Sequence, residues 1–578
     1  MERESASLGG EPVSLNQTIF QGFEWYIPAD HQHWIRLSQA MPSLASLGIT
    51  SIWIPPATKA MRSTSEGYDA YDLYDLGEFE RHGTKRTKYG DKRELVQLSE
   101  IANRHGVSIL FDAILNHKMG ADNTESVRAV KVDPEGMVLF MIKAWTKYDF
   151  PGRGEKYSSM KWNKDHFTGV DYDQKSKRNG VWRFQGKDWA HDVDEELTNY
   201  DFLLGQDIDH SHHEVREDLF NWVEWLSSQL RLGGLRLDAI KHFSASFLRD
   251  FVRHIDQNID AGTDWFIVGE YWRADSKVLS AYIEYMNHRM SLFDVPLLTN
   301  FYNISKGILT DARRVFDGSL AAVKPKNAVT FVVNHDTQAG QSLEVFPILV
   351  SSLFFLRLLL PCTSSPDFLS LISYTDFRKT IIEPWFLPLA YSLILLRENF
   401  GIPCVFWADL YGTLEPTLPQ PPPSNGIIIP RLILARKLWA YGTETLYFED
   451  SPTCAGLTRA GHPSRSAGAG LAVVMNTGWT SSGKHMCVGK VHAGETWSDV
   501  LGQTWGEVII DTDGMGYFRA CPRSVSVWVH DAAEGRDEAD SLVFDDGGYS
   551  AVQGAMDKIK LREPLNTMPA WLQSTTEA

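Results

Sequence analysis

Gly234-Leu235-Arg236-Leu237-Asp238-Ala239-Ile240-Lys241-His242 is the stretch around which the chain is organised. It begins as a short apolar strand and ends in an arginine, a carboxylate, a lysine and a histidine. Because side chains alternate along a strand, Arg236 and Asp238 share one face. A guanidinium beside a carboxylate keeps that carboxylate ionised near neutral pH, which suits a nucleophile. A structural ion pair explains this stretch equally well, but three other strands of the chain end in the same way.

The composition limits what the chain binds. A length of 578 residues is too great for one ordinary domain, so we expect roughly two to four. The net charge of -17, from 56 Lys+Arg against 73 Asp+Glu, argues against nucleic acid and anionic membranes as partners. The N-terminal residues contain no apolar run, so no secretory signal is expected. Five scattered cysteines are interpreted as reduced thiols of a cytoplasmic protein.

Eight short apolar segments end in polar residues, and helical patterns separate most of them. The apolar segments are 20–25, 51–56, 108–117, 234–242, 266–272, 291–296, 329–336 and 403–409. The clearest helical patterns are 91–105, 214–230, 244–257 and 384–398. Strands that alternate with helices in this way predict an α/β fold, a (β/α)8 TIM barrel. The polar ends of its strands then meet at one rim, where such barrels carry their chemistry.

Three further segments depart from this alternation. Residues 117–211 have little helical period and are predicted to form an inserted domain after the third strand. Residues 441–530 contain short alternating runs that predict a C-terminal antiparallel β-sandwich domain. Residues 531–578 form an acidic tail that we expect to be disordered. The catalytic barrel is therefore assigned to 1–116 and 212–440.

Residues 345–382 do not fit the barrel. The segment opens on an apolar run of about 15 residues that contains Arg357, which is short for a membrane span of about 20. It stands where the seventh strand should pass directly into the helix at Pro384. We interpret it as an insertion foreign to the fold, such as a retained intron. A genuine loop specific to the family is the alternative.

The polar residues at the rim suggest cleavage of a glycosidic bond. They are Asp112, Asn116, His117, Arg236, Asp238, Lys241, His242, Glu270, Asn334, His335 and Asp336. This reaction needs one carboxylate as nucleophile and one carboxylic acid to protonate the leaving oxygen. Asp238 fits the first role. Glu270 fits the second, because burial at the end of an apolar strand raises its pKa. Asp336 would hold sugar hydroxyls and help to stabilise positive charge at the ring.

Four segments, FDAILNH, GLRLDAIKH, GEYW and FVVNHD, resemble the four signature regions of the α-amylase family of glycoside hydrolases. The likeness extends from about residue 20 to 529, and it is greatest to liquefying-type bacterial amylases and intracellular fungal ones. The resemblance implies retaining, endo-acting hydrolysis of α-1,4 bonds in starch, glycogen or malto-oligosaccharides. It implies Asp238 as nucleophile, Glu270 as acid/base and Asp336 as the third catalytic carboxylate.

The resemblance also implies substrate contacts and a metal. The substrate-binding positions would be Tyr68, His117, Arg236, Lys241 and His335. The ligands of a structural calcium would be Asn116, Asp201, Asp207 and the backbone carbonyl of His242. These are hard oxygen donors, as calcium prefers, although an acidic pair alone is more often a solvated loop. Ala190 and Ser211 replace acids of the family's denser cluster, which disfavours a second calcium and a sodium, although Asp209 remains.

Two other functions compete with α-glucan hydrolysis. A 4-α-glucanotransferase would use the same residues but pass the glucosyl group to a sugar. A catalytically inactive glucan-binding protein is the second alternative, favoured by the foreign segment that enters after Asp336 and disfavoured by the presence of all three carboxylates. The expected partner is an α-glucan, with no nucleic acid and no membrane, and we expect a monomer.

Overall fold

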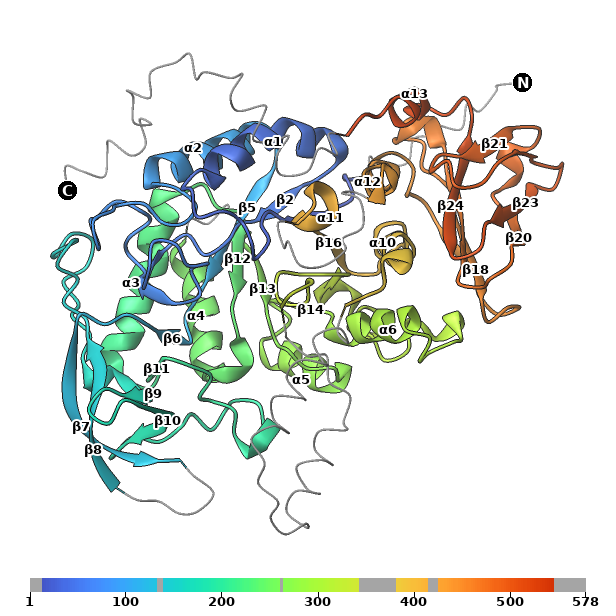
Figure 1. Ribbon diagram of the computed structural model, residues 1–578. Helices are drawn as coiled ribbons and strands as arrows, with labels where there is room; N and C mark the ends of the chain where they lie inside the picture. The colour runs from blue at the N-terminus through green and yellow to red at the C-terminus, as the bar shows by residue number, and fades with distance from the viewer. Residues whose placement is uncertain (1–12, 133–138, 260–263, 342–380, 414–424, 545–578) are drawn as a thin grey trace, which may run out of the picture. The chain divides into compact units, whose positions relative to one another are not determined.

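The computed structural model describes residues 13–132, 139–259, 264–341, 381–413 and 425–544 (Figure 1). The chain divides into two compact units. Of the described residues, those within 13–26, 273–280 and 294–544 form the first unit, and those within 27–272 and 281–293 form the second. The predicted insertion at 345–382 lies outside the described residues except for its last two positions.

Eight strands form the barrel. They are β1 (Ile19–Gln21), β2 (Ser51–Trp53), β5 (Ser108–Ala113), β12 (Gly234–Leu237), β13 (Phe266–Gly269), β14 (Ser291–Phe293), β15 (Ala328–Phe331) and β16 (Ile402–Phe406). They close in the order β1-β16-β15-β14-β13-β12-β5-β2. Each strand overlaps one predicted segment, so the predicted barrel is confirmed. Several segments run past their strands because the polar residues that follow belong to the rim and not to the sheet.

The principal helices are α1 (His33–Leu47), α2 (Lys92–Arg104), α3 (His213–Gln229), α4 (Ala245–Asn258), α5 (Ser276–Tyr285), α6 (Val295–Ser305), α7 (Leu320–Val323), α10 (Leu387–Leu395), α11 (Trp407–Tyr411) and α12 (Ile428–Leu438). Local sequence explains where they start. Asp91 and Glu94 form a capping box before α2, with each side chain accepting a hydrogen bond from the other residue's backbone N–H at 3.1 and 3.0 Å. Ser244 caps α4 as predicted, accepting from the N–H of Phe247 at 3.2 Å.

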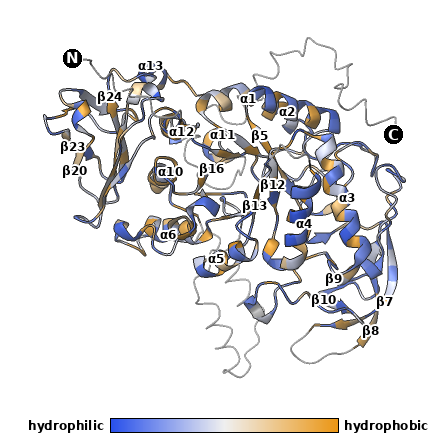
Figure 2. Ribbon diagram, turned by 180° about the vertical axis from the view of Figure 1, so that it is seen from behind, coloured by the Kyte–Doolittle hydropathy of each residue, from blue (hydrophilic) through white to orange (hydrophobic). Residues whose placement is uncertain are grey.

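In the second unit, α1 packs beside α2, and α3 packs beside α4 (Figure 1). Apolar residues recur at helical spacing on α4, where Phe247, Leu248 and Phe251 are buried. Figure 2 shows mainly hydrophilic residues on the side of α3 and α4 that is turned to the viewer. An amphipathic face of this kind covers the barrel on one side and meets water on the other.

The surroundings of Gly234, the first residue of the stretch 234–242, require glycine at this position. β12 lies between β5 and β13, and its register places Arg236 opposite Asp112 on one side. A Cβ atom on Gly234 would lie 1.8 Å from the backbone oxygen of Phe266. No side chain fits at that distance, so the strand passes between its neighbours only with glycine here.

Residues of the predicted insertion form a six-stranded sheet. Its strands are β6 (His117–Lys118), β7 (Asn123–Lys131), β8 (Leu139–Lys147), β9 (Phe167–Asp173), β10 (Arg178–Phe184) and β11 (Gln206–Ile208). The order is β6-β11-β9-β10-β7-β8. β11 pairs with β6 so that Asp207 lies opposite His117. This pairing returns the end of the segment to the rim of β5. A short ladder of β3 (Lys59–Ala60) and β4 (Ala70–Asp72) precedes it.

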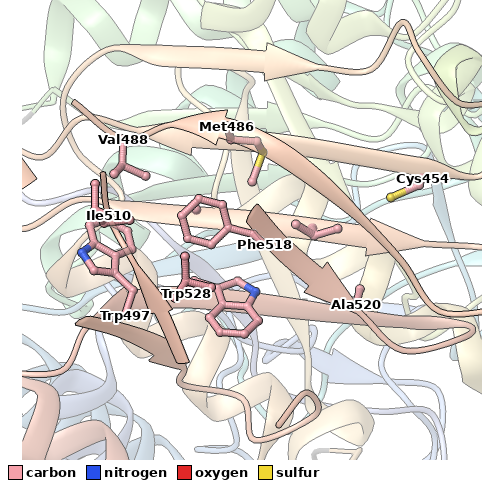
Figure 3. Packing of buried hydrophobic residues seen from close by; sticks show 11 residues of the cluster. Cys454, Met486, Val488, Trp497, Ile510, Phe518, Ala520 and Trp528 are labelled. Carbon is pink, nitrogen blue, oxygen red and sulfur yellow. The ribbon is translucent and has the colours of Figure 1, made fainter. Parts of the chain in front are cut away.

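The C-terminal part forms two antiparallel sheets, which confirms the predicted β-domain. Its strands are β17 (Glu444–Tyr447), β18 (Cys454–Arg459), β19 (Leu471–Asn476), β20 (Ser482–Cys487), β21 (Thr496–Asp499), β22 (Glu507–Ile509), β23 (Met515–Ala520) and β24 (Ser524–His530). One sheet has the order β17-β18-β19-β24-β21-β22, and the other pairs β20 with β23. Figure 3 shows the core between them, where Phe518 lies 6.1 Å from Trp497 and 6.0 Å from Trp528 between ring centroids.

Within the expected tail 531–578, the described residues 531–544 form turns and the short helix α13 (Arg536–Asp540), and 545–578 lie outside the described residues. Cys404, Cys454, Cys487 and Cys521 are free thiols, and Cys362 lies outside the described ranges. Among the helices that the structure describes, none combines the length and the apolar character that a bilayer crossing requires.

Candidate active site

Arg236 is the centre of a buried cluster of acids in the second unit. Its Nη1 donates to Asp238 Oδ1 at 2.6 Å and to Asp112 Oδ1 at 2.7 Å. Its Nη2 lies 2.9 Å from Glu270 Oε2. All four side chains are buried. One guanidinium therefore faces three carboxyl groups, and the cluster carries excess negative charge if all of them are ionised.

Burial and mutual repulsion raise the pKa values of these acids. Burial raises the pKa of Asp238 to about 6, with Arg236 acting to lower it and Asp112 acting to raise it. We predicted that Arg236 keeps Asp238 ionised near neutral pH. A pKa of about 6 agrees with that prediction, but burial outweighs the guanidinium. Burial also raises the pKa of Glu270, and the charge of Asp238 adds to this effect while Arg236 opposes it.

Asp238 and Glu270 bind the two terminal nitrogens of one guanidinium, so their carboxyl groups lie close together. The charge of Asp238 acts to raise the pKa of Glu270, and two neighbouring carboxyl groups favour a state in which one of them holds a proton. The Oε2 atom of Glu270 accepts from Arg236 and also from the N–H of Ala239 at 3.1 Å. These donors leave Oε1 as the oxygen that can hold the proton. The raised pKa of Glu270 favours its protonated form, and the ion pair with Arg236 favours the ionised form of Asp238.

Asp112 has a larger part in this cluster than the sequence indicated. The sequence placed it at the rim without a role, and it missed Trp53. The Oδ2 atom of Asp112 accepts from Trp53 Nε1 and from Tyr68 OH, both at 2.9 Å. Asp112 is thereby fixed where it holds Arg236. The parallel register of β2, β5 and β12 brings these residues together, and no signal in the sequence gives that register.

His117 and Tyr68 are coupled through the backbone. His117 Nε2 donates to the carbonyl oxygen of Tyr68 at 2.8 Å, and its Nδ1 accepts from Asn116 Nδ2 at 3.2 Å. Burial lowers the pKa of His117 to about 4, so the ring is neutral. Its only N–H is therefore already used by Tyr68. Contact between His117 and a sugar stays a prediction, while its observed partner is the backbone of the residue expected to stack on that sugar.

Lys241 and His242 lie in the short helix η3 (Ile240–His242) that follows β12. Lys241 Nζ donates to Glu196 Oε2 at 2.7 Å and to the carbonyl oxygen of Trp272 at 3.0 Å. His242 Nδ1 donates to the carbonyl oxygen of Tyr200 at 2.7 Å. These bonds tie the end of β12 to the inserted segment.

In the first unit, the residues that follow β15 form a turn. Asn334 Oδ1 accepts from the N–H groups of Asp336 and Thr337 at 3.1 and 2.9 Å, which shapes the turn. Gln21 Nε2 lies 3.0 Å from His335 Nδ1, and an amide nitrogen only donates, so this ring nitrogen accepts. His335 Nε2 then carries the hydrogen, and it lies 3.3 Å from Asp336 Oδ2. Asp336 is partly exposed, whereas His335 is buried.

The structure thus brings together Arg236, Asp238 and Glu270 in the second unit, and His335 and Asp336 in the first. That Asp336 faces the same sugar ring as the other two carboxyl groups stays a prediction. Gln21 was not singled out from the sequence. It stands at the end of the first predicted strand, and the rule that polar strand ends form the site would have included it.

Asp201 and Asp207 have the properties of cation ligands. Burial raises the pKa of Asp201 to about 7 and that of Asp207 well above its ordinary value, and the charge of Asp201 adds to the second shift. The Oδ1 atom of Asn116 is buried and has no hydrogen-bond partner among the described residues. Asp207 lies opposite His117, the residue after Asn116. Buried acids that retain a proton and an unsatisfied amide oxygen fit a hard cation such as calcium.

Asp209 is the remaining acid of the denser cluster that the family has, and its negative charge is already neutralised. Lys187 Nζ donates to its Oδ2 at 2.6 Å, and the N–H of Ser211 donates to its Oδ1 at 3.0 Å. These hydrogen bonds lower the pKa of Asp209 although burial opposes them. Lys187 therefore already neutralises the negative charge that a second cation would need.

His166, His212 and Glu214 form a second group with metal-ligand chemistry, in which one potential ligand atom of each residue lies within 4.8 Å of the others. The Nδ1 atom of His166 accepts from the N–H of Asn163 at 3.0 Å. Its Nε2 consequently carries the hydrogen, and it lies 3.0 Å from Glu214 Oε2. A histidine that binds a metal donates from its other nitrogen. The group is therefore better described as a hydrogen-bonded His–Glu pair.

A closed parallel barrel whose strand ends hold a buried pair of carboxyl groups on one arginine fits a glycosidase. The family described as "Alpha amylase, catalytic domain" matches residues 34–343, and "Alpha-amylase C-terminal" matches residues 471–529. The chain belongs to the α-amylase family of glycoside hydrolases, as the four signature segments predicted.

Similar proteins extend over most of the chain. The α-amylase of Bacillus licheniformis is 41% identical over 523 residues, which cover 89% of this chain and 94% of the relative. The glucan 1,4-α-maltohexaosidase of Bacillus sp. (strain 707) is 41% identical over 532 residues, with coverages of 89% and 92%. The cytoplasmic α-amylase of Escherichia coli (strain K12) is 36% identical over 531 residues, with coverages of 89% and 99%.

Solved structures share the fold at low sequence identity. The α-amylase from Geobacillus thermoleovorans, complexed with acarbose, has a TM-score of 0.55 at 16% identity, and the match covers 89% of this chain and 98% of that one. CldA, a cyclomaltodextrin glucanotransferase, has a TM-score of 0.55 at 18% identity, with coverages of 90% and 99%. Because hydrolases and transferases share the architecture, it does not decide between them.

Proposed function

We propose that this chain hydrolyses internal α-1,4-glucosidic bonds of starch, glycogen or malto-oligosaccharides with retention of configuration at the anomeric carbon. The observation that carries the proposal is the buried pair of Asp238 and Glu270, whose carboxyl groups bind Arg236 at 2.6 and 2.9 Å. Relatives named α-amylase and glucan 1,4-α-maltohexaosidase, both 41% identical over most of the chain, support the class of substrate.

In the proposed reaction, Glu270 donates its proton to the glycosidic oxygen while the Asp238 carboxylate attacks the anomeric carbon. The bond to the leaving sugar breaks, and a glucosyl ester forms on Asp238. Glu270, now a carboxylate, takes a proton from water, and the resulting hydroxide equivalent cleaves the ester. The position of both carboxyl groups on one guanidinium supports retention, because an inverting enzyme separates its carboxyl groups by roughly 6.5–9.5 Å to admit a water.

The electrostatics of the cluster support the change of role that Glu270 undergoes. Ester formation removes the charge of Asp238, which is one of the causes that raise the pKa of Glu270. Arg236 remains and acts to lower the pKa of Glu270. Glu270 is therefore a weaker acid before the ester forms than after it, as a residue that is first acid and then base requires.

The remaining substrate contacts are proposals that follow the family resemblance. Tyr68 would stack on the sugar at the cleavage point, held by its bonds to Asp112 and His117. His335 and Asp336 would bind hydroxyl groups of the substrate. Lys241 would serve the leaving-group side, and it is fixed by Glu196.

We also propose a structural calcium ion bound by Asn116, Asp201, Asp207 and the carbonyl oxygen of His242. The raised pKa values of the two acids and the unsatisfied oxygen of Asn116 support this assignment. The ion would neutralise the two acids and join the inserted segment to the strand ends that carry the site. It takes no part in bond cleavage.

A cytoplasmic location is proposed from the reduced cysteines and from the likeness to a relative named cytoplasmic α-amylase. A monomer, with an α-glucan as partner and neither nucleic acid nor a membrane, remains our expectation.

Product analysis tests the proposed function. Purified chain is incubated with maltopentaose and maltoheptaose, and the products are followed by chromatography and by NMR of the anomeric protons. Shorter products that appear first as α-anomers are expected. Oligomers longer than the substrate would instead mean a glucanotransferase, and unchanged substrate would mean a binding protein. Asp238→Asn should abolish product formation, whereas the matched exposed variant Asp317→Asn should retain it.

A further inference from the structure

The turn after β15 is fixed to the end of β1 by side chains of the first unit. Gln338 Oε1 accepts from the N–H of Trp25 at 2.9 Å, and its Nε2 donates to Glu24 Oε2 at 2.9 Å. Thr413 Oγ1 donates to the same oxygen of Glu24 at 2.7 Å. Gln338 and Glu24 are both buried. The chain at the end of β1 therefore holds the turn that carries two of the predicted site residues.

His335 is enclosed by alternate residues of this β1 segment. Gln21 Nε2 lies 3.0 Å from His335 Nδ1. The ring centroid of Phe23 lies 5.2 Å from that of His335, and the ring of Trp25 is parallel to it within 7° at 6.1 Å between centroids. Because His335 is only 1% exposed, its ring does not turn without displacing these neighbours. Three uncharged side chains thus fix the orientation of His335.

Two neighbours of His335 act on its charge in opposite directions. Its Nε2 lies 3.3 Å from Asp336 Oδ2, and a carboxylate at this distance favours the charged ring, which has a hydrogen on both nitrogens. Gln21 donates to Nδ1, and this hydrogen bond exists only while Nδ1 has no hydrogen of its own. Glu24, the other acid of these two segments among the described residues, accepts from uncharged donors. Gln21 therefore favours the neutral ring where Asp336 favours the charged one.

We propose that Gln21 is a positioning residue that keeps His335 uncharged, so that the ring does not neutralise the negative charge of Asp336. This inference rests on the proposed function, in whose reaction the sugar ring gains positive charge. A charged His335 would form an ion pair with Asp336 and weaken the attraction between Asp336 and that positive charge. A neutral His335 instead holds Asp336 through the hydrogen on Nε2. Gln21 acts through His335 and not on the substrate.

Two substitutions of Gln21 test this role. Gln21→Met removes the donor to Nδ1, and Gln21→Glu replaces it with an acceptor. In both variants Nδ1 can hold a hydrogen, so His335 should become charged at a higher pH than in the wild type, and the effect should be larger for Gln21→Glu. Gln229→Met is the matched control, because Gln229 is also buried, at 5% exposure, and its Nε2 donates to Ser228 Oγ on α3.

Nitrogen NMR of the full chain, labelled selectively in histidine, reports which ring nitrogens carry hydrogen. The signal of His335 is identified by its loss in His335→Gln. We expect a neutral ring with its hydrogen on Nε2 in the wild type at about pH 6, and a charged fraction in both Gln21 variants at that pH. This measurement does not depend on activity. A charged ring in the wild type, a hydrogen on Nδ1, or a ring unchanged in both Gln21 variants would overturn the proposal.

Kinetics on maltoheptaose separate the effect on charge from a structural effect. Relative to the wild type at the same pH, we expect kcat of the Gln21 variants to fall about tenfold at about pH 6, with KM nearly unchanged, and to recover at about pH 8, where His335 is neutral again. Gln229→Met should match the wild type at both pH values. Melting temperatures of all variants exclude unfolding as the cause.

An equal loss of kcat at both pH values would mean a structural role for Gln21 and would overturn the proposal. A wild type that has a neutral His335 but does not cleave maltoheptaose would refute the proposed function alone. Hydrolysis by the wild type with no loss of kcat in Gln21→Glu, although NMR shows that its His335 is charged, would refute this inference alone.

Discussion

Asp112 and Asp238 accept hydrogen bonds from the same atom, Nη1 of Arg236, at 2.7 and 2.6 Å. The charge of Asp112 is one of the causes that raise the pKa of Asp238. Asp112→Asn removes that charge and keeps an oxygen that accepts from Nη1. The pKa of Asp238 should fall below about 6, so the acid limb of kcat/KM should move to lower pH by about one unit.

The pH profile of kcat/KM on maltoheptaose checks this shift. Asp238 must be ionised to attack, so activity is lost as pH falls through its pKa, and a lower pKa extends activity to more acidic solutions. The apparent value belongs to the coupled pair with Glu270 and not to Asp238 alone. An acid limb that stays in place, or moves to higher pH, would contradict the electrostatic role given to Asp112.

Arg236→Gln should remove both activity and stability. Three buried acids then lose the guanidinium that they share, and truncating one member of such a network costs about 3–5 kcal/mol. We expect kcat to fall at least about a thousandfold, because Asp238 would no longer be ionised at neutral pH. Kinetics at saturating substrate and thermal melts measure the two effects. Arg314→Gln, which breaks an exposed ion pair, is the control and should change neither.

The barrel could be predicted because its strands are apolar runs with abrupt polar ends. Asp238, Glu270 and Asn334 all lie just past their strands, which explains why the predicted segments were longer than the strands. The polar residues indicated the position of the rim more clearly than the apolar runs indicated the extent of the strands. Periodicity cannot separate these two parts, because a residue that follows a strand continues the same alternation for one or two positions.

The contacts within the rim could not be predicted in the same way. Arg236 meets Asp112 because β12 pairs with β5 in one register, and a sequence does not state which residues of two distant strands lie opposite each other. The sequence also did not indicate the backbone conformation of Ala239. This residue adopts a left-handed conformation with φ of 50° that turns the chain after Asp238, and alanine rarely does so. The burial of the acids follows from this register and from the turn at Ala239. The raised pKa of Asp238 follows from that burial.

Removal of calcium should destabilise the chain most at alkaline pH. The pKa values of Asp201 and Asp207 are raised in the folded, ion-free chain, so it binds more protons than the unfolded chain between about pH 4 and 7. Its free energy of unfolding therefore falls as pH rises through that window. A chelator should lower the melting temperature more at about pH 8 than at about pH 5.5, where protons replace the ion.

Differential scanning calorimetry with and without a chelator at both pH values checks this expectation. Asp207→Asn should abolish the response to chelator. Asp209→Asn should keep it, because the carboxylate of Asp209 is neutralised by Lys187. A melting temperature of the wild type that is indifferent to chelator at both pH values would remove calcium from this site.

Gly234→Ala should disrupt the barrel at the strand that carries Arg236. The added Cβ would lie 1.8 Å from the backbone oxygen of Phe266, and neither backbone can move away without breaking the pairing of β12 with β13. We expect a loss of about 3 kcal/mol or more in the free energy of unfolding. Gly106→Ala is the matched control. Gly106 also has a positive φ, of 71°, but its Cβ would meet nothing within 4 Å, so its cost should be about 1–2 kcal/mol. Urea denaturation of both variants separates the steric cost from the conformational one, and equal losses would mean that the close approach of Phe266 does not dictate glycine at position 234.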